Sequence, residues 1–406
     1  MSKSQIKDNE EMNLSAIQAA LREQGADAWL FADFRHSDPL AYRILGLDGG
    51  GLCTRRWFYL VPAHGDPVKL NHRIEPGKLD SLPGSKLIYS RWQELHEGLR
   101  KMLAPHKKVA MQYSAMNNIP YVSTVDAGTI ELIRSLGAEV VSSADLVQIF
   151  EARWSPEQKE SHFAAAKIVD GIRADAFAEV GRQIRAHGST DEYTIARYIL
   201  DRFAAAGLAT HDTPIVGVNA NGSDCHYEPA PGRSTPIRPG DWLLIDMWAK
   251  EKKPGAVYYD ITWCGYIAAK PGDKPSAKHQ SVFEVVREAR DSAVAFVNDA
   301  VKAGRAICGW QVDDVARGVI TKAGYGEYFV HRTGHSIQVE IHANGANMDN
   351  LETRDERRVI PWTCFSVEPG IYLPEFGVRL EVNCFVDEKG AGTTGAVQKE
   401  PVIVQI

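Results

Sequence analysis

The sequence predicts an α/β (α+β) protein built from two domains. Residues up to about 150 alternate helical and strand-like stretches, and a strong helix-start signal follows at Ser155-Pro156-Glu157. Further helices and apolar, strand-like runs fill the remainder of the chain. The 406 residues are 44% hydrophobic and 24% charged, which is enough material for two domains with sizeable cores.

The first 150 residues contain a helix and several buried strands. Leu14 to Gln24 has the pattern of an amphipathic helix, and Gly25 closes it. Apolar runs predict strands at residues 28–31, 57–61, 109–111 and 139–141, with helical patterns between them. We recognise no catalytic or ligand-binding motif in this α/β domain.

A long helix opens the second domain. Ser155 caps it, Pro156 fits its first turn, and Glu157 suits its positive end. Because the helix starts here and runs to about His187, we predict domains of residues 1–153 and 154–406. Three more helices are expected: one opened by a capping box at residues 189–192 and ending at Gly207, and two over about 275–304 and 311–323.

Composition and charge exclude several classes of function. The net charge is −6, from 52 acidic and 46 basic residues without a basic block, which argues against a nucleic-acid partner. The first eleven residues have no apolar core, so we expect no secretory signal. No run approaches the roughly 18 apolar residues of a membrane span. We therefore expect a cytoplasmic protein with a small or neutral substrate and no membrane partner.

Six scattered cysteines show no CxxC spacing. This favours reduced thiols over a disulfide framework. Cys225 precedes His226, but neighbours in sequence do not by themselves form a nucleophilic dyad, so we disfavour a thiol catalyst.

Chemistry is indicated by five side chains at the edges of strand-like runs in the second domain: Asp246, Asp260, His335, Glu368 and Glu381. Buried carboxylates must be paired or must coordinate metal, so the set has the composition of a two-metal site. The alternative is four unrelated surface acids and a core histidine. The two acid pairs have nearly equal spacing in the sequence, which suggests two similar hairpins facing one another.

The order of these residues resembles that of the pita-bread metallopeptidases, which include methionine aminopeptidase, aminopeptidase P and prolidase. Three segments carry the resemblance: Thr333–Ile337, Val367–Tyr372 and Gly377–Glu381. It covers about residues 155–406 and implies a pita-bread catalytic domain of two αββ halves after a smaller creatinase-type α/β domain. It also implies a homodimer in which the N-terminal domain of one chain partly closes the site of the other.

The resemblance implies two divalent metal ions per chain. Asp246 would bind one ion, Asp260 and Glu381 would bridge both, and His335 with Glu368 would complete the other shell. Oxygen ligands dominate, which argues against a single structural zinc. Manganese is favoured, with cobalt, zinc or iron as alternatives. Glu368 would also act as the general base.

Four other side chains match family positions around the substrate. His226 would contact substrate near the cleaved bond, His342 would stabilise the tetrahedral intermediate, and His331 would line the leaving-group pocket. Arg379 would orient a carboxylate; a surface salt bridge is the alternative. The odd spacing of His335 and His342 requires a bulge or turn if both face the metals.

The predicted function is hydrolysis of short peptides, as Xaa-Pro dipeptides or at N-terminal Xaa-Pro bonds. The alternatives are a hydrolase of another C–N bond and a non-catalytic binding protein on the same fold. Trp263, Gln338 and Ala343 depart from the prolidase pattern, and we expect them to alter the substrate pocket. Three extra residues also lengthen the hairpin between Asp246 and Asp260.

Overall fold

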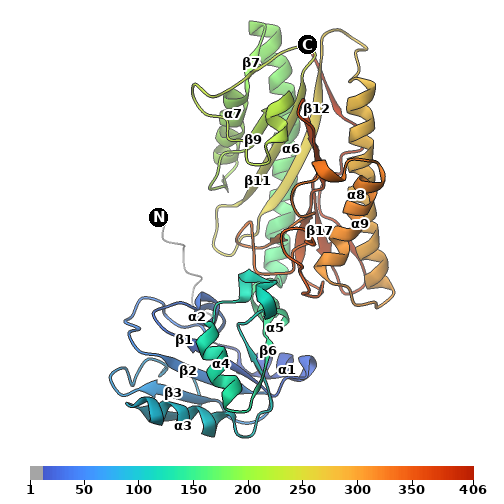
Figure 1. Cartoon of the computed structure of the whole chain (residues 1–406). Coiled ribbons are helices and arrows are strands. Elements are labelled where there is room, and N and C mark those ends of the chain that lie inside the picture. Colours follow the sequence, from blue (N-terminus) through green and yellow to red (C-terminus); the bar gives the residue numbers. More distant parts are fainter. Residues whose placement is uncertain (1–11) are drawn as a thin grey trace. The chain divides into compact units, whose positions relative to one another are not determined.

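The computed structural model describes residues 12–406, and the chain divides into two compact units after Glu151 (Figure 1). Residues 1–11, where the absence of a secretory signal was predicted, lie outside the described residues. Each unit has its own hydrophobic core. No helix within residues 12–406 combines the length and the apolar character needed to cross a membrane.

The first unit contains one six-stranded sheet with the strand order β4-β3-β2-β1-β5-β6. Its strands are β1 (Ala28–Asp33), β2 (Trp57–Pro62), β3 (Val68–His72), β4 (Ser85–Tyr89), β5 (Lys108–Met111) and β6 (Glu139–Ser142). The pairs β1–β2 and β2–β3 are antiparallel, and the other pairs are parallel. The four predicted strands are confirmed. Strands β3 and β4 were not predicted; β4 is an edge strand whose largely exposed residues lack an apolar run.

Helices cover both faces of this sheet. Helices α1 (Leu14–Gln24), α2 (Pro39–Ile44) and α5 (Ala144–Glu151) pack on the face that presents Trp29 and Phe31. Helices α3 (Trp92–Leu103) and α4 (Ala127–Ser135) pack on the opposite face, against Leu30 and Leu60. Two short 3₁₀ helices, η1 (Ala115–Asn117) and η2 (Pro120–Val122), precede α4. Alternation of side chains along β1 thus serves two cores.

Four helices frame the second unit: α6 (Pro156–His187), α7 (Glu192–Ala205), α8 (Ala277–Lys302) and α9 (Gly309–Lys322). Ser155 caps α6 as predicted, since its hydroxyl accepts a hydrogen bond from Gln158 N at 3.2 Å. The predicted capping box of α7 is wrong. Asp191 is the cap and accepts from Thr194 N, while the Glu192 carboxylate is engaged elsewhere.

Two sheets and a hairpin lie among these helices. The first sheet contains β8 (Leu208–Ala209), β9 (Ile215–Val218), β11 (Trp242–Glu251), β12 (Tyr259–Ala268) and β19 (Val402–Gln405). The second contains β13 (Ser336–Ile337), β14 (Cys364–Val367), β17 (Val382–Val386) and β18 (Ala391–Thr393). The hairpin is β15 (Gly370–Tyr372) with β16 (Gly377–Arg379); the remaining short elements are β7 (Thr190–Asp191), β10 (Pro236–Ile237), η3 (Asn219–Ser223) and η4 (Gly326–Tyr328).

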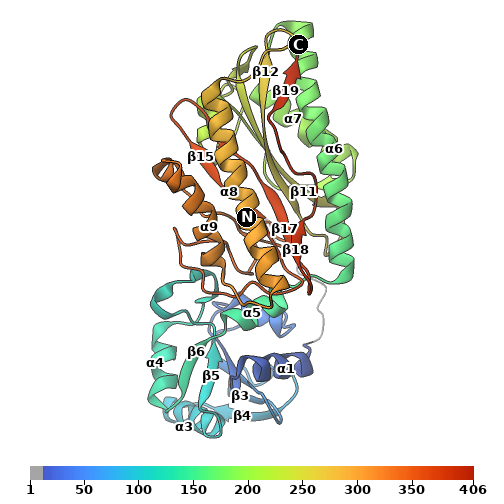
Figure 2. The same cartoon turned by 90° about the vertical axis from the view of Figure 1, so that its right-hand side faces the viewer.

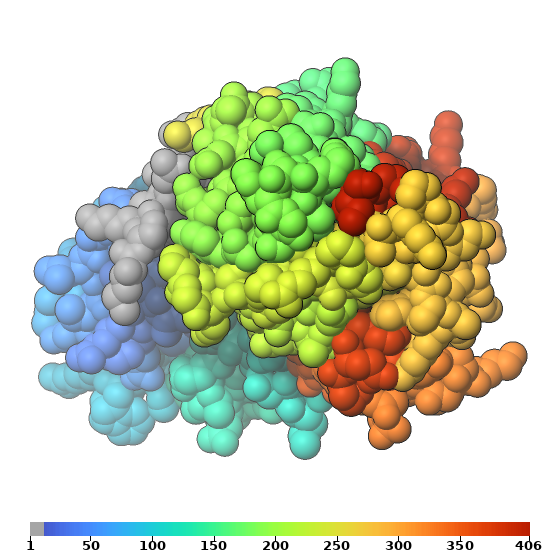
Figure 3. Space-filling model, turned by 90° about the horizontal axis from the view of Figure 1, so that it is seen from above, coloured from blue at the N-terminus to red at the C-terminus, as the bar shows by residue number. Residues whose placement is uncertain are grey.

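Strand β11 divides the core of this unit. Leu243 and Ile245 pack in the cluster formed with α6 and α7, whereas Trp242 and Leu244 pack in the cluster formed with α8 and α9. Figures 1 and 2 both show the strands between α6 on one side and α8 on the other. At the surface, the yellow-green residues near position 220 lie beside the green residues of α6 and α7 (Figure 3). Asp246 lies two residues after Leu244 on the strand, so the two side chains point to the same face, away from α6 and α7.

Candidate metal centre

Asp246 and Asp260 come from paired antiparallel strands. Asp246 on β11 lies opposite Thr262, and Asp260 on β12 lies opposite Trp248. The two acids are therefore diagonal neighbours, two positions apart in the ladder, and side chains with this spacing share one face of a sheet. The predicted hairpin does bring this acid pair together.

The other two acids and the histidine come from segments next to the second sheet. Glu368 directly follows β14 and Glu381 directly precedes β17, and these strands pair with Val367 opposite Val382. The backbone N–H of Glu381 donates to the Thr262 carbonyl at 3.1 Å, which ties this segment to β12. His335 is fixed beside Glu368, because Ser366 Oγ accepts from His335 N at 2.9 Å and donates to Glu368 Oε1 at 3.0 Å.

The five side chains converge. His335 Nε2 lies 3.4 Å from Glu368 Oε1 and 3.6 Å from Asp260 Oδ2. One ligand atom from each of Asp260, His335 and Glu381 fits within 4.8 Å of the others. Asp246, Asp260, His335 and Glu381 are at most 8% exposed, and the side chain of Glu368 is 16% exposed.

Arg379 is the cation in direct contact with this group. Its Nη2 donates to Asp246 Oδ2 at 2.5 Å, its Nε donates to Thr262 Oγ1 at 3.1 Å, and its Nη1 donates to Tyr372 Oη at 3.0 Å. Its side chain is 3% exposed, so the surface salt bridge considered for it is wrong. Thr262 Oγ1 in turn donates to Glu381 Oε2 at 2.9 Å. One guanidinium thus orients acids from both sheets.

The charges within the cluster do not balance. Burial raises the pKa of Asp246 to about 6, even with Arg379 in contact, and raises that of Asp260 to about 7. Burial also raises the pKa values of Glu368 and Glu381, and neighbouring carboxylates add to the effect. Oxygens of three acids, Asp246 Oδ1, Asp260 Oδ1 and Glu381 Oε1, are buried without a hydrogen-bond partner. Orphaned carboxylate oxygens beside an imidazole are the donor set that divalent cations prefer, so the residues fit metal binding.

The three remaining histidines lie at different distances from the cluster. The His342 and His335 rings are 4.3 Å apart in an edge-to-face arrangement, because the chain turns after β13 and Ala343 N donates back to Ser336 O. The required turn between the two histidines is therefore present. His331 Nε2 forms a 2.6 Å hydrogen bond with Tyr372 Oη, and His226 is exposed on the segment after η3.

Trp263 does not face the cluster, contrary to expectation. Its neighbours Thr262 and Cys264 have the parity of Asp260, so Trp263 projects to the opposite face of β12. There the Arg173 guanidinium of α6 stacks 3.5 Å from the Trp263 ring centroid, within the core shared by α6 and α7. Gln338 is buried in the turn and hydrogen-bonds the adjacent Val339 N through its own Oε1.

Sequence reasoning missed several polar residues around the acids. Thr262 is two residues from Asp260, and Asn383 is two residues from Glu381. In an extended strand each would therefore lie on the same face as the acid, which the sequence spacing could have indicated. The Asn383 side chain accepts from Asp260 N at 3.0 Å and donates to Asp260 O at 2.5 Å, so it joins β12 to β17. Tyr372 gave no local signal, because its role depends on contacts with Arg379 and His331. None of the six cysteines takes part in a disulfide, as predicted.

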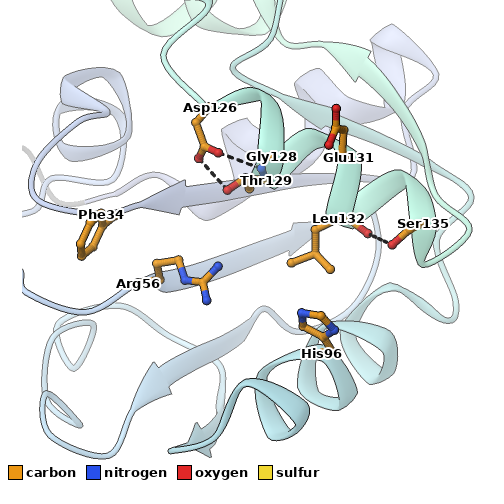
Figure 4. Close-up of a pocket in the computed structure, with 9 residues that line it drawn as sticks. All are labelled: Phe34, Arg56, His96, Asp126, Gly128, Thr129, Glu131, Leu132 and Ser135. Carbon is orange, nitrogen blue, oxygen red and sulfur yellow. Dashed lines mark hydrogen bonds between the residues drawn. The ribbon is translucent and has the colours of Figure 1, made fainter.

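A separate cavity of about 750 Å³ lies in the first unit (Figure 4). It is lined by Phe34, Arg56, His96, Asp126, Gly128, Thr129, Glu131, Leu132 and Ser135. Asp126 is the cap of α4, and its carboxylate accepts from the backbone and hydroxyl of Thr129. None of the candidate site residues lines this cavity, so the chemistry is assigned to the acid cluster.

Comparison with known proteins shows similarity to a family of metal-dependent peptidases. The model of metallopeptidase family M24 matches residues 163–388. The Xaa-Pro dipeptidase of Lactobacillus helveticus is 41% identical over 133 residues, covering 32% of this chain and 33% of that protein. The Xaa-Pro dipeptidase of Lactobacillus delbrueckii subsp. lactis is 30% identical over 214 residues, covering 52% of each. The matched regions thus span a third to about half of these relatives.

Solved structures share the whole architecture. Dipeptidase PepE from Mycobacterium ulcerans has a TM-score of 0.65 at 22% identity and covers 97% of both chains. The Xaa-Pro dipeptidase from Bacillus anthracis has a TM-score of 0.58 at 20% identity, covering 96% of this chain and 98% of that one. This likeness confirms the predicted fold, a mixed α/β N-terminal unit followed by a pita-bread unit.

Replacing Asp260 with Asn should lower the content of divalent metal at every site of the cluster, because this carboxylate lies within reach of both His335 and Glu381. Elemental analysis after reconstitution with Mn(II) measures the change, with the exposed Asp201→Asn as the matched control. We expect two ions per chain in the control and fewer than one in Asp260→Asn. Equal metal content in the two variants would contradict the assignment.

Proposed function

The chain belongs to metallopeptidase family M24, and from that premise we propose that it hydrolyses short peptides with proline after the cleaved bond. The observation that carries the proposal is the buried cluster of four carboxylates and His335, whose orphaned oxygens fit divalent cations. The two Xaa-Pro dipeptidases among its relatives support the choice of substrate.

Two divalent ions, with manganese favoured, would be held by Asp246, Asp260, His335, Glu368 and Glu381. When bound, such ions act as Lewis acids and make water a nucleophile near neutral pH. The same five side chains weigh against the alternative C–N hydrolases of the creatinase branch, which resemble this fold without the metal ligands. They also weigh against a purely binding role, which would not need a buried and uncompensated acid cluster.

Glu368 is the residue assigned to proton transfer. Its carboxylate is held by Ser366 Oγ and lies 3.9 Å from Arg379 Nε, and its raised pKa suits a group that takes up a proton and releases it again. Glu368 accepts the proton of the attacking water as the oxygen adds to the carbonyl carbon. It then delivers this proton to the leaving nitrogen as the C–N bond breaks.

His342 is assigned to the carbonyl oxygen. Loss of hydration, followed by the neighbouring His335 ring, lowers the pKa of His342 well below its usual range, so the imidazole is neutral and keeps one N–H donor at neutral pH. Such a donor stabilises negative charge that develops on the oxygen. His226 and His331 are assigned to substrate contact on either side of the bond. Arg379, already bound to Asp246, is reassigned to orienting that ligand.

A peptide panel tests the substrate class. Xaa-Pro dipeptides, Xaa-Ala dipeptides and Xaa-Pro tripeptides are assayed with Mn(II), Co(II) and Zn(II), and we expect cleavage of the proline peptides. A misfit of one methylene costs about 1–3 kcal/mol, so preference can shift without loss of activity. If metal-loaded protein cleaves none of the panel, the peptidase assignment fails.

His342→Ala should lower kcat by about 10²–10³, the scale of losing one oxyanion donor, without loss of metal. Steady-state kinetics on the best panel substrate and elemental analysis give the two values. The control is His187→Ala, at the end of α6 and outside the cluster. Metal loss in His342→Ala with the fold intact would instead make His342 a ligand.

The homodimer remains a prediction from family resemblance. Sedimentation equilibrium at working protein concentration should give about twice the 44.9 kDa mass of one chain. A monomer that retains full activity would contradict both the dimer and the proposal that a second copy closes the site.

A further inference from the structure

Glu192, the first residue of α7, is a fully buried acid that has no role in the proposed chemistry. Its carboxylate accepts hydrogen bonds from two backbone groups, Val218 N at 2.8 Å and Thr235 N at 2.7 Å. It also accepts from Asn221 Nδ2 at 2.9 Å and from the Tyr227 hydroxyl at 2.6 Å. A carboxylate is an acceptor only, so this set of four donors matches it without an orphaned group.

All four donors belong to one stretch of chain, residues 218–235. Val218 and Thr235 stand at its two ends, while Asn221 and Tyr227 lie within it. Glu192 therefore closes this stretch into a loop by binding both ends and the interior at once. We call residues 218–235 the Glu192 loop; it belongs to the yellow-green surface in Figure 3.

The far side of the Glu192 loop is held by the β15–β16 hairpin. Ser223 Oγ donates to the Leu373 carbonyl at 2.5 Å. Gly222 and Gly377 touch through their backbones, since a Cβ on Gly377 would lie 1.9 Å from Gly222 O. This hairpin also carries Tyr372 and Arg379, which contact the acid cluster.

Between these two attachments the Glu192 loop carries Cys225 and His226. Cys225 follows Ser223 by two residues, so this part of the loop lies next to the β15–β16 hairpin that carries Tyr372 and Arg379. His226 follows directly. Its backbone N–H donates to Asp224 Oδ1 at 3.1 Å.

We propose that Glu192 is a positioning residue, which fixes the Glu192 loop, and His226 with it, against the β15–β16 hairpin that contacts the acid cluster. Its effect on catalysis rests on the proposed peptidase function, whereas its effect on the loop does not. Glutamine at this position has the same size but turns an N–H donor toward existing donors. The loop would then open more often without unfolding of the core.

The thiol of Cys225 reports on the loop directly. Native protein is treated with iodoacetamide, and labelling of each cysteine is followed by peptide mass spectrometry. We expect Glu192→Gln to label at Cys225 at least about tenfold faster than the wild type, the factor given by losing one hydrogen bond to a charged acceptor. Tyr227→Phe should show a smaller increase in the same direction, since it removes one donor and keeps the carboxylate.

The matched control is Glu179→Gln on α6, whose carboxylate accepts hydrogen bonds from Arg182 and Gln183 of its own helix. It should label at the wild-type rate.

With an Xaa-Pro peptide, Glu192→Gln should raise KM with metal content unchanged, because His226 contacts substrate and not the ions. If the protein cleaves no peptide, the proposed peptidase function is wrong. The labelling comparison does not depend on activity and would still test the role of Glu192.

Unchanged labelling of Cys225 in both Glu192→Gln and Tyr227→Phe would overturn the proposal. So would faster labelling of the buried Cys384 in step with Cys225, because that pattern reports general destabilisation. If Glu192→Gln does not fold, Tyr227→Phe decides between the two outcomes alone.

Discussion

Four carboxylates share a buried space with one guanidinium, and this imbalance of charge is the constraint on which the second unit depends. Burial raises the pKa values of all four acids. Arg379 compensates one of them, and hydrogen bonds from Thr262 and Ser366 hold two more. The remaining negative charge is tolerable only with protons or cations in the cluster.

The surrounding helices and strands hold the acids of this cluster close together. Helices α6 and α7 cover one side of β11 and β12, and α8 and α9 complete the core on the other side. The side chain of Asn383 and the backbone of Glu381 join the two sheets at the acids themselves. Candidate ligands from three separate stretches of sequence are therefore placed by backbone pairing, and their side chains need little freedom of their own.

The helices and strands were predictable because they depend on local pattern, whereas the pita-bread arrangement and the roles of the acids were implied by the resemblance to a known family. Caps at Ser155 and Gly25 mark helix ends, and apolar runs mark strands. What failed depended on contacts across the chain. Glu192 has the form of a capping-box residue, but donors from residues 218–235 bind its carboxylate instead. The orientation of Trp263 follows instead from the alternation of side chains along β12, a local pattern that the resemblance to other proteins does not reveal.

The raised pKa values also bear on the state of the protein before metal arrives. Carboxyl groups with pKa values of about 6 and 7 hold protons to a substantial extent just below neutrality. A divalent ion must displace those protons, so its uptake is an exchange of cations and not a simple addition. Lower pH then favours the protonated, empty cluster and weakens apparent metal affinity. Burial therefore favours the binding of both protons and divalent ions to these carboxylates, and the two compete for them.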